Sequence, residues 1–271
     1  MERAGWSDPE TAASYASDFA YAAEQSVETL LDAANVAAGM RVLDVCCGHG
    51  IVSRRAVQRG AHATGVDFSP AMIRMARENA PTAEFIEGDA LDLPFDDASA
   101  DAVVMGFGIL HVPDAEAAAV EAARVLKPGG CFAYSCWHGA ERASALPAVF
   151  EAIAAHGDPR ITLPPAKPAP YYAQRENAEA MLVQAGFADI CIDSVESHWL
   201  CSAPDDPLRF FAEGTVRGAG LLRAQPAAHH HAIRRAVIDW VHATGSRDAV
   251  SGKTRVPLPA AVVSAQKANV P

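Results

Sequence analysis

The sequence lacks several features that mark secreted, membrane-spanning or nucleic-acid-binding proteins. Its 271 residues have a formal net charge of −11, which argues against a broad surface for a phosphate backbone. No apolar run is long enough to cross a bilayer, so we expect no membrane span. The first thirty residues contain no lysine, unlike a secretory or transit leader. We therefore expect a cytoplasmic protein, compatible with a homo-oligomer, whose partner is a small molecule rather than nucleic acid.

Disulfide and metal-ligand patterns are also missing. The six cysteines show no Cys-x-x-Cys spacing, and several fall in apolar runs that predict buried strands. Cys46 and Cys47 are adjacent, so their side chains should point in different directions. Three consecutive histidines at 229–231 fall in a predicted helix, where neighbours diverge by about 100°. We therefore predict reduced cysteines and no bound metal.

What the sequence does contain is an alternation of short apolar runs with helical stretches. The apolar runs cover 41–45, 61–66, 83–87, 102–105 and 131–136. The helical stretches between them cover 51–59, 70–79 and 115–126. Strands that are apolar on both faces and alternate with helices predict an α/β fold with a parallel sheet covered on each side.

Outside this alternation the pattern becomes irregular, and we interpret the chain as a single domain over residues 1–271. Helices are expected over 1–35 and the core over 36–137. Two insertions, at 138–175 and 204–243, should form a helical lid over the acceptor. The last strands are expected at 188–201 and 256–267.

The stretch from Val42 to Ser53 predicts a ligand loop. An apolar strand leads into Gly48-His49-Gly50 and then into a helix, which presents free backbone N–H groups to a ligand. Asp67 closes the next strand, 17 residues past Gly50, where a carboxylate can accept both hydroxyls of a ribose. However, "GHGIVS" lacks the last residue of the dinucleotide fingerprint, so a nicotinamide cofactor is only weakly indicated.

Two further carboxylates favour a different nucleoside. Asp44 lies four residues before Gly48, where it would repel a pyrophosphate and attract a cation. Asp89 closes the third strand, where the base of a nucleoside could be met. Three carboxylates at successive strand ends suit a ligand with a ribose, an adenine amine and a positive charge.

The residues that carry these features resemble a known family. The segments "VLDVCCGHG", "GVDFSPAMIRMAR", "EGDALDLPF", "DAVVMGFGILHVPD" and "RVLKPGG" are similar to successive motifs of class I S-adenosylmethionine-dependent methyltransferases. The fourth resembles the ubiquinone/menaquinone-type and small-molecule branch. The resemblance covers roughly residues 36–137 and implies a Rossmann-like seven-stranded sheet, mostly parallel with an antiparallel edge strand. One departure is Cys46, where the family usually has Gly or Ala.

The resemblance also implies residue roles toward S-adenosylmethionine. Asp44 orders the loop and faces the amino group, Asp67 takes the ribose diol, and Asp89 meets the adenine amine. Tyr15 matches a tyrosine that closes over the cofactor. The other residues implied to border the cofactor are Cys46, Cys47, Gly48, Gly50, Phe68, Met72, Ala90, Gly106 and Phe107.

Several of these residues have a plainer alternative. Phe68 and Met72, four positions apart, could simply belong to the core. Trp137, Tyr171 and Tyr172 are candidates for acceptor contact, although they could merely pack the lid. His111 follows the fourth strand and is a candidate general base, but it could equally cap a helix that starts near Pro113.

The function implied is methyl transfer to a small, hydrophobic acceptor of the quinone, natural-product or lipid-like kind. The sequence leaves open whether oxygen, nitrogen or carbon is methylated. The tetrapeptide typical of enzymes that methylate amino groups of nucleic-acid bases, N/D-P-P-Y/F/W, does not follow the fourth strand. Two alternatives remain: a cofactor-binding protein that transfers no methyl group, such as a cyclase or regulatory binder, and a nicotinamide-dependent oxidoreductase.

Overall fold

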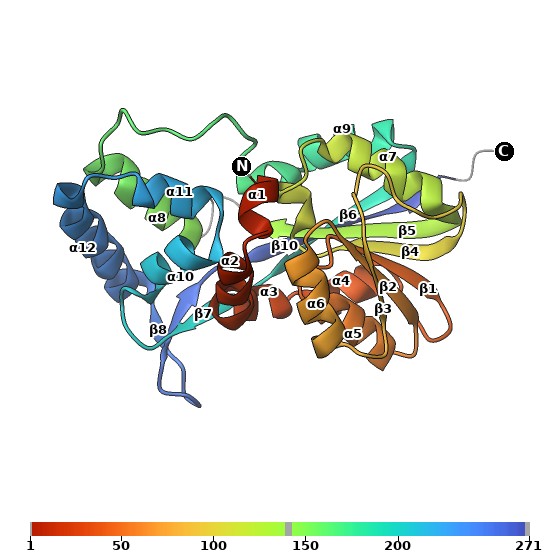
Figure 1. Cartoon of the computed structure of the whole chain (residues 1–271), viewed down its shortest axis with the longest axis horizontal. Helices are drawn as coiled ribbons and strands as arrows, with labels where there is room; N and C mark the ends of the chain where they lie inside the picture. Colours follow the sequence, from red (N-terminus) through yellow and green to blue (C-terminus); the bar gives the residue numbers. More distant parts are fainter. Residues whose placement is uncertain (1, 139–142, 269–271) are drawn as a thin grey trace. The chain divides into compact units, whose positions relative to one another are not determined.

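The computed structural model describes residues 2–138 and 143–268, and the contacts among them form two compact units (Figure 1). Unit 1 consists of residues 1–22, 138–167 and 196–259. Unit 2 consists of residues 23–137, 168–195 and 260–271. Each is described by itself below.

Unit 2 is built on a seven-stranded sheet with the strand order β3-β2-β1-β4-β5-β10-β6. The strands from β1 to β5 pair in parallel, whereas β10 is antiparallel to both of its neighbours, β5 and β6. The strand bounds are β1 Arg41–Val45, β2 His62–Asp67, β3 Glu84–Glu87, β4 Ala100–Met105, β5 Leu126–Trp137, β6 Phe187–Val195 and β10 Ala260–Lys267. The predicted sheet, mostly parallel with antiparallel pairing toward one edge, is confirmed.

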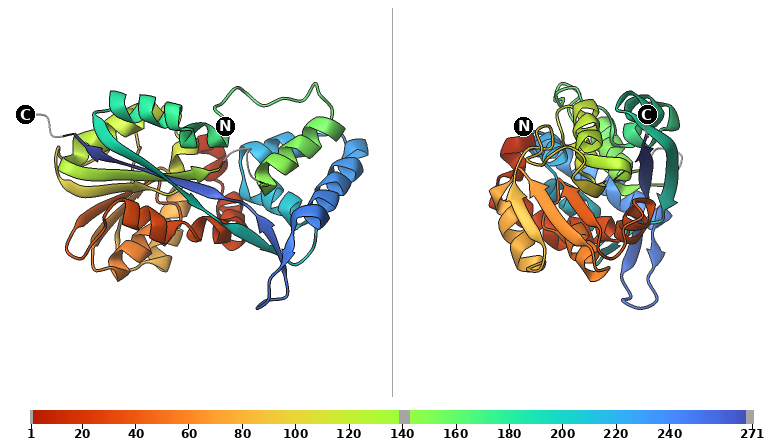
Figure 2. Two further views of the ribbon diagram at one scale, coloured as in Figure 1. Left: turned by 180° about the vertical axis from the view of Figure 1, so that it is seen from behind. Right: turned by 90° about the vertical axis from the view of Figure 1, so that its right-hand side faces the viewer.

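Helices cover both faces of this sheet (Figures 1 and 2). The central strand β4 is apolar on both faces, because its alternate side chains point to opposite sides of the sheet. Val103 and Met105 pack in one core cluster with α7 and α9. Ala102 and Val104 pack in the other with α4 and α5. The helix bounds are α4 Val27–Ala33, α5 Ile51–Gln58, α6 Pro70–Asn79, α7 Ala115–Val125 and α9 Arg175–Gln184, with short 3₁₀ turns η2 Gly108–Leu110 and η3 Ala169–Ala173.

Unit 1 is mainly helical and has its own aromatic core. Its elements are α1 Glu2–Trp6, α2 Pro9–Ser14, the π-helix η1 Tyr15–Phe19, α8 Ala145–His156, α10 Asp206–Gly214, α11 Arg217–Arg223, α12 Ala227–Thr244, and an antiparallel sheet of β7 His198–Cys201, β9 Thr254–Pro257 and β8 Ser246–Arg247. Trp199 is fully buried, makes edge contacts with Phe19 and Phe210, and donates its indole N–H to the Phe19 carbonyl. The remaining helix, α3 Ala20–Glu24, continues the chain into unit 2.

Two sequence expectations about strands are corrected. The runs at 188–201 and 256–267 each form two strands, β6 with β7 and β9 with β10, which belong to different sheets. Pro257 and Pro259 supply no backbone donor, so β9 cannot continue directly into β10. The segment 127–130 lies inside β5, where a register shift against β4 accommodates it.

No helix among the residues described is both long and apolar enough to cross a bilayer.

Candidate cofactor site

The loop that follows β1 brings the predicted site residues of unit 2 together at the carboxyl ends of the strands. Gly50 ends the loop in the left-handed conformation, with φ 83°, and α5 begins at the next residue. Gly48 is also left-handed, with φ 53°, and a Cβ placed there would meet no atom within 4 Å. The loop backbone therefore faces open space that a ligand can approach closely.

Asp44 is the most constrained carboxylate of the site. It is 1% exposed, and its Oδ2 accepts hydrogen bonds from the backbone N–H of Ser53 at 2.9 Å and from the Ser53 hydroxyl at 2.7 Å. Across residues 2–138 and 143–268, no donor reaches the other oxygen, Oδ1. Burial raises the pKa of Asp44 to about 7, and the nearby Asp67 carboxylate adds to the rise. A buried oxygen without a donor is costly, so this atom is suited to a cationic ligand.

Asp67, the last residue of β2, accepts hydrogen bonds both from the loop after β1 and from the residues that follow β2. Its Oδ2 accepts the Gly48 N–H and its Oδ1 accepts the Ser69 N–H, both at 2.9 Å. Burial raises the pKa of Asp67, whereas these backbone donors and the His111 imidazole act to lower it. Each carboxylate oxygen can accept a second hydrogen bond, so Asp67 retains acceptor capacity for a diol.

The two cysteines of the loop are packed rather than poised for reaction. Cys46 adopts φ 57°, a left-handed conformation that explains why glycine suits this position. A Cβ at Gly108 would lie 2.5 Å from the Cys46 Cβ, so the two residues fit closely. Burial raises the pKa of both the Cys46 and the Cys47 thiol, which keeps them protonated. Within the described ranges, no group of three His, Cys, Asp or Glu is arranged to hold a metal ion.

An aromatic wall stands beside the end of β4. The ring of Phe107 stacks on Trp137 with the centroids 4.1 Å apart, and both side chains are buried. The Phe107 backbone, at φ 58°, donates its N–H to the Ser135 hydroxyl. Gly106 precedes it, and a Cβ there would lie 3.1 Å from Val52.

The residues implied for adenine lie at the ends of β2 and β3. Met72 is buried in α6 and Ala90 is buried after β3, whereas Phe68 is partly exposed. Asp89 forms a tight turn in which its side chain accepts the Leu91 N–H and its carbonyl accepts the Asp92 N–H. The carboxylate is partly exposed at this turn, which is compatible with the predicted base contact.

The remaining predicted residues differ in where they lie. Tyr172 is buried in the main core cluster of unit 2, and its carbonyl accepts the Tyr134 hydroxyl at 2.8 Å, so it packs η3 against β5. Tyr171 contacts it edge to face and remains partly exposed. Tyr15 belongs to unit 1, where it contacts Trp6 and Phe19. Its approach to the cofactor stays a prediction.

His111 does not cap a helix, and that alternative is wrong. Helix α7 begins at Ala115, and Asp114 caps it by accepting the Ala117 N–H at 2.9 Å. His111 instead ends the turn η2, donating its N–H to the Gly108 carbonyl. Its imidazole is partly exposed, and its positive charge acts to lower the pKa of the Asp67 carboxyl.

Sequence reasoning missed two serines. Ser53 holds Asp44 from the first turn of α5, and Ser135 holds the Phe107 backbone from β5. Both are completely buried. A buried serine in the first turn of a helix after a glycine loop was the available signal for Ser53, whereas nothing in the sequence pairs Ser135 with Phe107.

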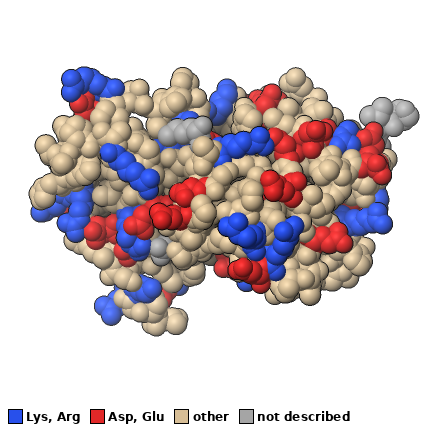
Figure 3. Space-filling view, in the orientation of Figure 1, with Lys and Arg blue, Asp and Glu red and all other residues tan. Residues whose placement is uncertain are grey.

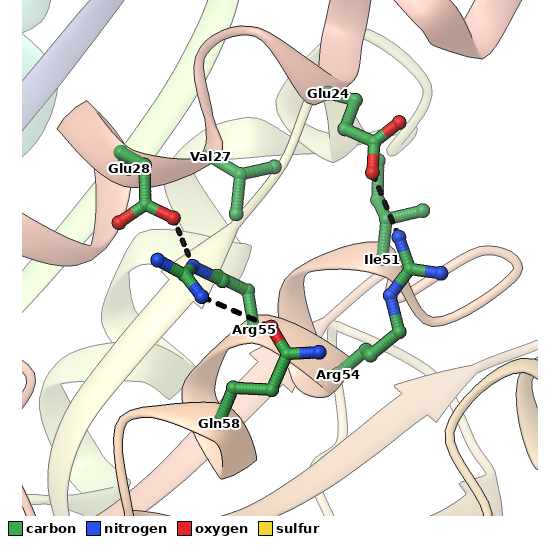
Figure 4. A pocket seen from close by; sticks show the side chains of 7 residues that line it. All are labelled: Glu24, Val27, Glu28, Ile51, Arg54, Arg55 and Gln58. Carbon is green, nitrogen blue, oxygen red and sulfur yellow. Dashed lines mark hydrogen bonds and ion pairs between the residues drawn. The ribbon is translucent and has the colours of Figure 1, made fainter.

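A separate hollow of about 280 Å³ lies between α3–α4 and α5 (Figure 4). Ion pairs from Arg54 to Glu24 and from Arg55 to Glu28 cross it. None of the predicted site residues lines it. Elsewhere, charges of both signs are interspersed on the face shown in Figure 3.

Comparison with known proteins places part of this chain in a family. Residues 42–130 match a family model described as a methyltransferase domain. The sheet order and the loop after β1 agree with the fold of class I S-adenosylmethionine-dependent methyltransferases.

Individual proteins show how far the likeness extends. A demethylmenaquinone methyltransferase of Staphylococcus aureus (strain MRSA252) is 46% identical over 98 residues, 34% of this chain and 41% of that protein. The chain thus matches less than half the length of this curated relative. The YcgJ protein of Bacillus subtilis aligns over 90% of this chain and 99% of its own, with 19% identity and a TM-score of 0.55. A Haemonchus contortus phosphoethanolamine N-methyltransferase 2, solved with S-adenosylhomocysteine, aligns over 90% of this chain and 52% of its own, with 20% identity and a TM-score of 0.52.

The site residues fit the cofactor of this class, S-adenosylmethionine. Asp44 Oδ1 offers a buried acceptor to the ammonium group, and the open space at Gly48 admits the methionine chain. The carboxylate of Asp67 lies one strand away for the ribose.

Proposed function

We propose that this protein transfers the methyl group of S-adenosylmethionine to a small, hydrophobic acceptor of the quinone, natural-product or lipid-like kind. The observation that carries the proposal is the unpartnered, buried oxygen of Asp44 beside an open glycine loop. The stacked Phe107–Trp137 pair supports an apolar acceptor. So does the 46% identity of the matched region to a demethylmenaquinone methyltransferase.

The chain's own residues supply alignment, electrostatics and exclusion of water. The cofactor, when bound, brings an electrophilic methyl group on a sulfonium. Asp44 would hold the ammonium end and Asp67 the ribose diol, and these two contacts would orient a bound cofactor. The buried rings of Phe107 and Trp137 keep water from the strand ends, and low polarity favours attack of an anionic acceptor on a cation.

His111 is proposed as the general base when the acceptor is a hydroxyl. Asp114 caps α7, and the charge of the His111 imidazole acts on the Asp67 carboxylate, which supports a role for His111 at the site. A neutral imidazole can accept the proton that an oxygen acceptor loses as it attacks. An acceptor that is already a phenolate or an activated carbon would need no such base.

A labelled-methyl assay over a panel of acceptors tests the proposal. Incubation with S-adenosyl-[methyl-³H]methionine and a demethylated naphthoquinone, a phenol, an amine and a fatty acid should label an apolar member of the panel. Labelling of none of them, together with saturable cofactor binding, would contradict methyl transfer and favour a cyclase or regulatory binder. Saturable binding of NADH in place of the adenosyl cofactor would favour an oxidoreductase.

A further inference from the structure

Arg124, in the motif "RVLKPGG", has no role in the site described so far, yet its contacts are unusually complete. The residue lies in the last turn of α7, and its side chain is 31% exposed. A guanidinium has five N–H donors, and the hydrogen bonds of Arg124 are also five. Their acceptors are both carboxylate oxygens of Glu121, the carbonyls of Leu93 and Phe95, and Asp97 Oδ1, at 2.8–2.9 Å.

All of the acceptors outside α7 lie on one loop, the segment between β3 and β4. Glu121 reinforces the attachment, because its Oε2 also accepts the backbone N–H of Leu93 at 2.9 Å. The Leu93 side chain is 3% exposed and packs in the main core cluster of unit 2. Residue 93 of this loop is therefore held at its N–H, its carbonyl and its side chain.

The held residue directly follows the turn that carries Asp89. In that turn, Asp92 N–H bonds the Asp89 carbonyl and Leu91 N–H bonds the Asp89 carboxylate. The turn therefore connects Asp89 through Asp92 to Leu93, the residue that α7 holds at its N–H and its carbonyl.

We infer that Arg124, with Glu121, is a positioning residue that sets the adenine selectivity of the cofactor site by fixing the Asp89–Asp92 turn. The inference rests on the proposed function, because it takes Asp89 as the acceptor for the adenine amine. Arg124 touches neither cofactor nor acceptor and acts only through the loop.

Arginine is required here for a geometric reason. A lysine retains the positive charge, but its single ammonium has three donors and cannot span two carbonyls and two carboxylates in one plane. Arg124→Lys should therefore loosen the loop while preserving the local charge. Arg59→Lys is the matched control: Arg59, the residue after α5, is also paired with two acids, and among the described residues its side-chain hydrogen bonds go to Glu28 and Asp32 rather than to this loop.

The experiment compares two nucleosides on the full-length chain. S-Adenosylhomocysteine carries the 6-amino group, whereas S-inosylhomocysteine carries a 6-oxo group that Asp89 cannot accept a hydrogen bond from. Wild type and Arg59→Lys should prefer the adenosyl ligand by about tenfold or more, the value of one well-placed hydrogen bond to a charged group. Arg124→Lys should reduce that preference by about fivefold, chiefly through weaker adenosyl binding. Amide hydrogen exchange at Leu91 and Asp92 should accelerate in Arg124→Lys only.

The outcomes separate the inference from the proposed function. Unchanged adenosyl preference and unchanged exchange at Leu91 and Asp92 in a folded Arg124→Lys protein would overturn the inference and leave the proposed function intact. Failure of the wild type to bind S-adenosylhomocysteine would overturn the proposed function itself. If Arg124→Lys does not fold, Asp97→Asn removes the charge from one exposed acceptor of the clamp, and it should show the same two changes at smaller size. Their absence there would equally count against the inference.

Discussion

The two units differ in how much of their sequence consists of recognisable ligand-binding motifs. In unit 2, the strand ends carry glycines and carboxylates, at positions 44, 67 and 89, that we propose bind the polar and charged groups of a nucleoside. Unit 1 contains no comparable motif, and its core is made of general aromatic packing around Trp199. The family model covers residues 42–130, which lie wholly in unit 2.

The largest expected effect comes from His111, at the reactive end of unit 2. If the acceptor is a hydroxyl, His111→Gln should lower turnover by roughly 10²–10⁴-fold with unchanged cofactor affinity. Glutamine has a similar shape but cannot take up the proton. Steady-state rates with the true acceptor measure this, and Asp114→Asn, which keeps the helix cap, is the control. Full turnover in His111→Gln would end the general-base role and leave alignment and desolvation as the sources of catalysis.

Removing the ribose carboxylate should have the next largest effect. Asp67→Ala should weaken S-adenosylhomocysteine binding by tens- to hundreds-fold, because two charge-assisted hydrogen bonds worth about 2–3 kcal/mol are lost. The substitution also removes the acceptor of the Gly48 and Ser69 N–H groups, so thermal unfolding must be followed in parallel. Calorimetric titration measures the affinity. A folded variant that binds as tightly as the wild type would remove Asp67 from the site.

The Asp44 carboxyl should make both the stability of the protein and its cofactor affinity depend on pH. Burial raises its pKa to about 7, so the folded protein keeps a proton that the unfolded chain releases near pH 4. The stability contributed by this proton is complete below about pH 4 and is lost as the pH rises to about 7, a change on the order of 4 kcal/mol. Asp44→Asn cannot ionise and should therefore gain stability relative to the wild type between about pH 5 and pH 8, while losing cofactor affinity.

Denaturant unfolding at the two pH values measures this difference, and Asp101→Asn gives a control of opposite sign. An ion pair with Lys127 lowers the pKa of Asp101, so that variant should lose stability relative to the wild type at the higher pH. Cofactor affinity of the wild type should rise up to about pH 7, because a cationic ligand favours the charged form of Asp44. An affinity that is flat between about pH 5 and pH 8 would contradict the role of its free oxygen.

The smallest effect tests unit 1. Phe150, on α8, is 40% exposed and contacts Phe211 edge to face. If this unit selects the acceptor, Phe150→Ala should raise the acceptor KM by about threefold to tenfold, the range for losing one aromatic contact, and leave cofactor affinity unchanged. Val250→Ala, at a side chain that is 96% exposed, should change neither value. An equal loss of cofactor affinity in Phe150→Ala would contradict the assignment of acceptor selection to unit 1 and of cofactor binding to unit 2.

Much of unit 2 was predictable because its signals are local. Strands apolar on both faces, a glycine loop and terminal carboxylates all occur within short segments. The features that the sequence did not reveal depend on tertiary contacts between residues far apart in the chain or on details of local geometry. The Tyr172 carbonyl accepts the hydroxyl of Tyr134, 38 residues away, and no local pattern reveals that contact. The runs at 188–201 and 256–267 read as continuous strands because periodicity does not reveal where a chain leaves one sheet for another. His111 and Asp114 lie three residues apart, and sequence alone could not decide which caps α7.

A crystal structure of the full-length chain with S-adenosylhomocysteine tests the central claim most directly. The account predicts the ligand's amino group within hydrogen-bonding distance of Asp44 Oδ1, about 2.7–3.2 Å, and the ribose diol on the Asp67 carboxylate. Ligand density in the hollow between α4 and α5, or a saturated crystal with no density at the strand ends, would contradict it.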